Sequence, residues 1–369
     1  MDKGRISLKQ LSLMIFMFTL GDSILVLPSG VIFSARQDAW ISGLISLVVG
    51  SMIMFLYYRV YMIDSNRTFL DNCRNVMGKW LGGTISIIYI FYCYISVALL
   101  MRELGAFFLT HFLIRTPMQI IMGLFILTVA LAVRIGVVSI ARASEIFIPV
   151  VLLLLSFLFF MLIYKINLKE FFPIWENGSK SILRGSIPFS AFAYMEIVSI
   201  IIFFSLVKDE KITFKKIWIP SLLGGAVLVI ATCYCITVLG VDEAANSLYP
   251  TLKLGQKIKI GMFFQRLDII VAILWLLTMF FKTVFYYYFT IQGTGKLFNL
   301  KEPNYLIFPL AFLAIPLGLN VAENIVDLNY ELVNIWPFFD FTVSIIIPGI
   351  VLVVSKVKSK IHKKNNKVI

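Results

Sequence analysis

The sequence predicts an all-α integral membrane protein with ten membrane-spanning helices. Of its 369 residues, 60% are hydrophobic and only 14% are charged, and the mean hydropathy is +0.92. A soluble domain of this length could not bury so much apolar surface. The second observation is the recurrence of apolar segments close to the ~20 residues that a spanning helix needs. These segments lie at 9–34, 40–62, 82–109, 117–138, 141–163, 183–206, 216–239, 265–288, 304–320 and 335–356.

The distribution of positive charge predicts the orientation of these spans. If both chain ends are cytoplasmic, the inner segments carry 21 Lys and Arg residues and the outer segments carry 10. Cytoplasmic loops are enriched in Lys and Arg, so this ratio favours cytoplasmic termini and an even number of spans. The net charge of +13 therefore reflects topology and not nucleic-acid binding. We expect one transmembrane domain over 1–356 and a basic cytoplasmic tail over 357–369.

The first span contains polar and helix-breaking residues at its centre. The run Gly21-Asp22-Ser23-Ile24-Leu25 lies there, and Pro28 follows it. An acid at the centre of a spanning helix costs about 2.5–3.5 kcal/mol on insertion scales. Broken helices persist at this depth only where protein or a water-filled cavity surrounds the freed backbone groups, and many transporters bind ligands at such breaks. We expect a ligand or ion site here, although capping of the outer half-helix explains Asp22 almost as well.

The sixth span is the counterpart of the first if the chain consists of two inverted halves, about 9–163 and 183–356. It contains Pro188 and, near mid-depth, Glu196. Asp22 and Glu196 each lie about twelve residues into their segments. Because a helix rises about 1.5 Å per residue, the two acids reach similar depths from opposite directions. Helix halves that end there offer free N–H and C=O groups to a charged ligand. Glu196 could equally belong to a structural polar network. The predicted ligand contacts are Gly21, Asp22, Ser23, Ile24 and Leu25 on the first span and Ala191, Ala193, Tyr194, Met195 and Glu196 on the sixth.

Other ionisable residues within spans need partners, because charge is costly in a bilayer. Arg102 and Glu103 are adjacent in the third span, and Asp268 enters the eighth span from the same side. We expect an Arg102–Asp268 ion pair, as a structural lock rather than an outer gate. Lys282 lies nearer the inner end of the eighth span and is expected to extend its ammonium group to the interface. Thr278 in that span offers a hydroxyl to a ligand or cation.

Two segments outside the spans are long enough to form structure. Residues 68–81 form either an amphipathic helix on the inner face or a solvated loop. Residues 242–261 form an outer connection that could serve as a lid or partner surface, or a simple loop.

Cofactor and enzyme chemistry have little support in the sequence. The chain has two His and four Cys, and three of the cysteines lie inside spans, so we expect no metal site, cofactor or disulfide framework. No Gly-x-Ser-x-Gly or His-Glu-x-x-His motif occurs, so no enzyme is expected.

Several stretches of the chain carry a family resemblance. They are Ile6-Ser7-Leu8-Lys9-Gln10, the break from Gly21 to Pro28, Arg36-Gln37-Asp38-Ala39-Trp40-Ile41-Ser42, Tyr249-Pro250-Thr251-Leu252, Phe264-Gln265-Arg266-Leu267-Asp268 and Trp275. Together they resemble the B subunit of spore germinant receptors, within the amino acid–polyamine–organocation superfamily, over essentially the whole chain. The resemblance implies a LeuT-like fold, a 5+5 inverted repeat with broken helices 1 and 6.

The resemblance also implies a function. It indicates a multi-pass protein of the spore inner membrane that acts with a larger A-type membrane subunit and a C-type lipoprotein subunit. A small germinant, an amino acid or a nucleoside, would bind between helices 1, 3, 6 and 8 and trigger germination. The family often has a glycine-rich step before the sixth-span acid, where this chain has Ala193-Tyr194-Met195, so we expect a narrower pocket or a different ligand. The alternatives are a transporter coupled to protons through Asp22 or Glu196, and a narrow water or ion channel on the same pathway.

Overall fold

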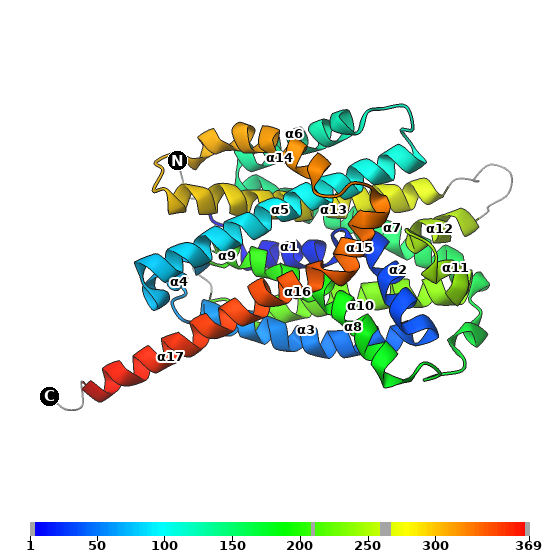
Figure 1. The fold of residues 1–369 in the computed structure, drawn as a ribbon, viewed down its shortest axis with the longest axis horizontal. Helices are drawn as coiled ribbons and strands as arrows, with labels where there is room; N and C mark the ends of the chain where they lie inside the picture. Colours follow the sequence, from blue (N-terminus) through cyan, green and yellow to red (C-terminus); the bar gives the residue numbers. More distant parts are fainter. Residues whose placement is uncertain (1–3, 208–210, 259–266, 366–369) are drawn as a thin grey trace.

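The computed structural model describes residues 4–207, 211–258 and 267–365, with side chains as far as residue 361. Residues 264–266, part of one resemblance motif, lie outside this range. Apart from one isolated β-bridge, the regular structure is helical, and nine helical stretches of the described chain are long and apolar enough to cross a membrane (Figure 1). The prediction of an all-α membrane protein is confirmed. The uninterrupted long helices are α3 (Ala39–Tyr61), α5 (Lys79–His111), α6 (Met118–Ile135), α7 (Val137–Leu162), α10 (Phe214–Tyr234), α13 (Asp268–Leu297) and α14 (Ile307–Asn320).

The first predicted span is broken at Gly21 and Asp22. Helix α1 (Leu8–Leu20) ends there and α2 (Ser23–Ala35) begins. Gly21 has a φ of +33°, and a Cβ at this position would collide with the Lys282 side chain. Pro28 does not contribute to the break, since α2 continues through it. Beyond α2, the 3₁₀ turn η1 (Arg36–Asp38) leads directly into α3, so residues 23–61 form one apolar helical stretch.

The sixth predicted span changes its helical form at mid-length. Helix α8 (Gly178–Tyr194) continues through Pro188, and the 3₁₀ segment η4 (Met195–Ile200) follows before α9 (Ile201–Phe204). The tighter winding frees backbone groups that need other partners. At this change of winding, the carbonyl of Met195 accepts a hydrogen bond of 2.7 Å from the Tyr57 hydroxyl. The second break therefore starts just before Glu196, at the position that the sequence indicates.

At the end of the bundle where the described chain starts and finishes, residues 69–77 form helix α4 (Phe69–Met77) (Figure 1). Thr68 and Asp71 make a reciprocal capping box, which explains why the helix begins there. Its apolar face is buried, and Lys296 at the end of α13 bonds to Thr68 and Asp71. The amphipathic helix predicted within 68–81 is thus present, and the solvated-loop alternative is wrong.

The opposite end carries the connection between α10 and α13. It contains α11 (Val241–Ala245) and α12 (Pro250–Lys257), which pack against α2 and α13. Of the predicted outer connection over 242–261, residues 259–261 lie outside the described residues. The described part is a packed pair of short helices, so the simple-loop alternative does not hold for it.

The last part of the chain is a series of helical segments around the tenth predicted span. They are α15 (Ile325–Asn334), α16 (Trp336–Phe341), the π-helical turn η7 (Thr342–Ile346) and α17 (Ile347–Asn365). Helix α17 projects beyond the bundle at the end where α4 lies, so the described part of the predicted tail is helical (Figure 1). The remaining short segments are η2 (Ile163–Lys165), η3 (Leu168–Phe171), η5 (Cys235–Leu239) and η6 (Pro303–Leu306).

Candidate functional site

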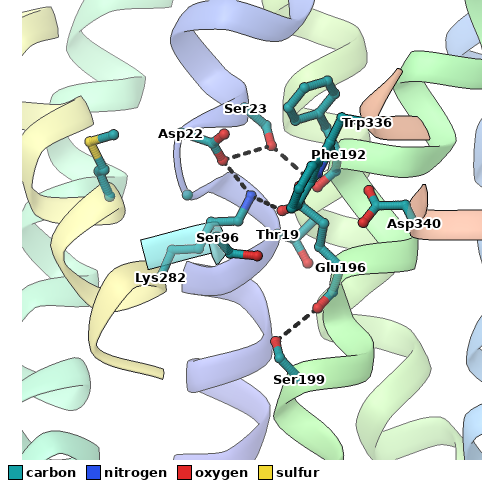
Figure 2. A network of polar contacts seen from close by, with 12 residues as sticks. Thr19, Asp22, Ser23, Ser96, Phe192, Glu196, Ser199, Lys282, Trp336 and Asp340 are labelled. Atoms are coloured by element: carbon teal, nitrogen blue, oxygen red, sulfur yellow. Dashed lines mark hydrogen bonds and ion pairs between the residues drawn. The ribbon is translucent and has the colours of Figure 1, made fainter. Parts of the chain in front are cut away.

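The two breaks meet at the side chain of Lys282. This lysine comes from α13, is fully buried, and forms ion pairs with Asp22 at the first break and with Glu196 at the second (Figure 2). The expectation that Lys282 extends to the membrane interface is wrong. Two carboxylates at mid-bundle replace the water that its ammonium group would otherwise need.

Asp22 does not cap the outer half-helix. It occupies the N-cap position of α2, but its side chain makes no capping hydrogen bond. The carboxylate turns instead to Lys282, and Ser23 lies 3.5 Å away with its hydroxyl toward the same oxygen. The capping explanation of this acid is therefore wrong.

Glu196 has partners on both sides. One carboxylate oxygen accepts a 3.0 Å hydrogen bond from the indole N–H of Trp336, and the other faces Lys282. The ring of Trp336 in turn stacks on Tyr92, with centroids 5.6 Å apart. Glu196 is thus part of a polar network that connects η4 with α13 and α16.

Side chains of neighbouring helices bind several backbone carbonyls at and near the two breaks. This satisfies the rule that polar backbone groups at membrane depth need partners within the protein. Thr278, which was predicted as a ligand contact, donates its hydroxyl to one of these backbone carbonyls. The four hydrogen bonds run from Thr278 to Gly21 O at 2.6 Å, from Trp275 to Asp22 O at 3.2 Å, from Thr251 to Ile24 O at 2.8 Å, and from Ser23 to Phe192 O at 3.3 Å.

A small cavity lies beside this network. The centre of a water molecule can occupy a volume of about 10 Å³ in this cavity, so the cavity holds about one water. Two of its lining acids, Asp22 and Glu196, were predicted as ligand contacts. The lining residues of α5 were not predicted as ligand contacts. They are Ser96, Leu99, Leu100 and Glu103, whose spacing in the sequence places them on one face of the helix. The full lining is Asp22, Ser96, Leu99, Leu100, Glu103, Phe192, Glu196, Tyr286, Leu332 and Trp336.

The predicted Arg102–Asp268 ion pair is not formed between these described residues. The Arg102 guanidinium donates to the carbonyl of Glu323 at 2.9 Å and lies against the sulfur of Met118. Neighbouring residues of a helix point about 100° apart, so Glu103 faces the cavity while Arg102 faces α6. Asp268 lies in the first turn of α13, where its carboxylate accepts from the backbone N–H of Ile269.

The bulky step before Glu196 does not narrow the cavity. The Tyr194 ring fills the space over Gly50 of α3 and Gly225 of α10, where any added Cβ would collide with it. Ala191, Ala193 and Met195 are also buried but are not part of the cavity lining.

The site contains more carboxyl groups than cations. Asp340 lies beyond Glu196 (Figure 2), fully buried, with one oxygen bound by the Tyr92 hydroxyl at 2.7 Å. The site thus contains four buried acids, Asp22, Glu103, Glu196 and Asp340. Lys282 is paired with Asp22 and Glu196, while Arg102 points elsewhere. Within the described residues, no group of three or more His, Cys, Asp or Glu side chains is arranged to hold a metal ion.

A larger groove lies on the other side of the α15–α16 junction. Its volume is about 800 Å³, and residues of α2, α8, α15 and α16 line it. Val333 and Asn334 face this groove, whereas Leu332 and Trp336 face the inner cavity. The junction is therefore a thin partition between the groove and the site.

Comparison with known proteins agrees with this architecture. The family model described as "spore germination protein" matches residues 5–325. Spore germination protein KB of Bacillus subtilis is 28% identical over 99% of this chain and 98% of its own length. Spore germination protein YndE of the same organism is 25% identical over 83% of this chain and 85% of its own.

A solved structure shows the same fold. The crystal structure of MhsT in complex with L-phenylalanine superposes with a TM-score of 0.68, covering 94% of this chain and 97% of that one. The sequence identity is 14%, so the likeness concerns the fold alone. The LeuT-like fold that the resemblance implied is confirmed.

Proposed function

We propose that this chain, which belongs to the spore germination protein family, is the B-type membrane subunit of a spore germinant receptor and binds its germinant. The germinant is a small nutrient, an amino acid or a nucleoside. It binds between the broken helices α1/α2 and α8/η4, against α5 and α13, and its binding triggers germination. One observation carries the proposal: Lys282 holds both breaks together beside a small cavity lined by acids.

Binding in this site requires a second conformation. A cavity of about 10 Å³ admits one water but not an amino acid or a nucleoside. A ligand shifts an equilibrium only through different affinities for the two states, so the germinant must bind an opened state. The α15–α16 partition separates the cavity from the larger groove and is the segment that we expect to move.

We further propose ten membrane crossings in two inverted halves. In this arrangement α1 and α2 together form the first crossing, α8 to α9 form the sixth, and one break falls in each half. Both chain ends are assigned to the cytoplasmic side of the spore inner membrane. Supporting this, the described chain starts and finishes at one end of the bundle, and the charge ratio favours that side (Figure 1).

The proposed partners are an A-type membrane subunit and a C-type lipoprotein subunit of the receptor. The proposal follows from the family, whose members are non-enzymatic membrane proteins of germination. The chain would supply the nutrient site, and the partners would read its change of conformation.

Substitution of Glu196 by Ala tests the proposed site. It removes a carboxylate that lines the cavity and holds the second break to Lys282, so spores carrying only Glu196→Ala are expected to lose their response to nutrients. Germination is followed by loss of optical density, and immunoblots of inner-membrane fractions verify the protein level. Glu323→Ala is a matched control, because that side chain is exposed. Normal germination of the Glu196→Ala spores at normal protein level would rule out the assigned site.

A further inference from the structure

We propose that Glu103 is the carboxylate that receives the ammonium group of the ligand, and that the ligand is therefore an amine with an apolar or aromatic body. This inference rests on the proposed function, because it assigns a chemical class to the ligand of that site. It differs from the sequence-based expectation, in which Glu103 belonged to a gate or lock with Arg102.

The first argument is the distribution of hydrogen-bond partners among the acids of the cavity. Asp22 and Glu196 are both bound to Lys282, and Glu196 also accepts from Trp336. Glu103 is 3% exposed, and its Oε1 has no hydrogen-bond partner in the described part of the chain. A buried polar atom without a partner is costly, and such atoms call for a functional explanation. Among the three cavity acids, Glu103 is the one that forms no ion pair with another described residue.

The second argument is the balance of charge. Asp22, Glu103 and Glu196 line the cavity, and Lys282 is paired with Asp22 and Glu196. Arg102, next to Glu103 in the chain, is turned toward the Glu323 carbonyl. An arriving ammonium group improves this balance, whereas an anion without an ammonium group would add a further negative charge and no cation.

The third argument is the rest of the lining. Leu99, Leu100 and Leu332 are aliphatic, and Phe192 and Trp336 are aromatic. These side chains suit an apolar or aromatic body next to the charged group.

The test compares ligands that differ only in the amino group. The probes are L-leucine and 4-methylpentanoate, L-phenylalanine and 3-phenylpropanoate, and inosine. Each is titrated against the purified full-length chain in lipid nanodiscs, and the unfolding temperature is measured, since a ligand that binds the folded state raises it. We expect at least one amino acid to raise it and neither deaminated acid to do so.

Variants then locate the effect at Glu103. Glu103→Gln keeps the shape and removes the charge, and is expected to raise the half-maximal concentration of the binding amino acid at least tenfold. Glu103→Asp keeps the charge and should be intermediate. Glu323→Gln, on an exposed side chain, should match the wild type. Because the comparison of amino acids with deaminated acids uses the wild-type chain alone, it remains decisive if a variant does not fold.

The outcomes separate this inference from the proposed function. Equal stabilisation by an amino acid and its deaminated form, or unchanged affinity of Glu103→Gln, would overturn the role of Glu103 and leave nutrient binding supported. Stabilisation by inosine alone would do the same. A wild-type chain that binds none of the five probes would count against both.

Discussion

Lys282 is the residue on which the arrangement of the two breaks depends. Its ammonium group is fully buried and bound to carboxylates from two different helices. Breaking a buried ion pair by removing one partner is destabilising by about 3–5 kcal/mol, because the other charge is left uncompensated. In this chain the removal of one lysine leaves two such charges.

Lys282→Ala is therefore expected to lower the free energy of unfolding by at least about 3 kcal/mol. The measurement is thermal or denaturant unfolding of the purified chain, with Lys301→Ala as the control on an exposed loop. A triple variant, Lys282→Met with Asp22→Asn and Glu196→Gln, carries no charge at these positions and should recover most of the loss. If Lys282→Ala unfolds like the wild type, the ion pairs do not hold the breaks together.

The sequence predicted two of the three members of this charge cluster. Asp22 and Glu196 stand out because an acid at mid-span is rare. The prediction for Lys282 is wrong because depth along a span does not determine which helical face a residue occupies. Trp275, Thr278 and Lys282 recur with helical spacing, and all three contact the first break. The spacing of Ser96, Leu99, Leu100 and Glu103 shows in the sequence that they share one face of α5. That this face lines the cavity depends on packing between distant segments, which local sequence does not contain.

At the scale of elements, α4 is held to the end of α13 by polar contacts. Asp71 is half-buried, which opposes its ionisation, but the hydrogen bonds from Lys296 and Thr68 outweigh this and place the pKa of Asp71 below its ordinary value. A carboxyl whose pKa is lowered on folding stabilises the fold at any pH above its unfolded pKa, and that contribution disappears as the pH falls through the folded pKa.

Asp71→Asn is expected to lower stability by a small amount at neutral pH, on the order of 1 kcal/mol or less because the pair is partly exposed. The difference from wild type should stay constant down to about pH 5 and shrink below about pH 4, where the carboxyl of the unfolded chain begins to be protonated. Unfolding temperatures of both proteins across this range provide the measurement. A difference that persists unchanged at the acid end would contradict the assignment to the ionised carboxyl.

The α15–α16 partition gives a second prediction at this scale. Trp336→Phe removes the 3.0 Å hydrogen bond to Glu196 but keeps an aromatic ring over Tyr92. The closed state should lose stability relative to the open one, and the apparent affinity for ligand should rise, because the competent fraction increases. Germination assays should show a several-fold lower half-maximal nutrient concentration, while Trp80→Phe, on an exposed residue, leaves it unchanged. A higher concentration requirement would show that Trp336 does not stabilise the closed state.

For the molecule as a whole, the apolar segments predicted most of the fold. Whether a segment spans the membrane depends mainly on its local hydrophobicity, which can be read from the sequence. The predicted spans 82–109 and 117–138 therefore correspond closely to α5 and α6. Helix α15 was missed because Asp327 and Glu331 interrupt its apolar pattern. The continuity of α2 with α3 was also missed, since the turn residues Arg36, Gln37 and Asp38 form a 3₁₀ turn where a loop was expected.

A sensor and a transporter differ in how often the buried site must open. A transporter must open the site to each side in every cycle, and here each opening would disturb a buried cluster that joins α2, η4 and α13. A sensor needs one such shift per signal, which ligand binding alone can supply. We therefore expect the isolated chain in proteoliposomes to bind its nutrient, taken from the thermal screen, without saturable uptake. Uptake of the radiolabelled nutrient is measured with and without an imposed pH gradient, against protein-free liposomes. Saturable uptake that the gradient accelerates would favour the proton-coupled transporter instead.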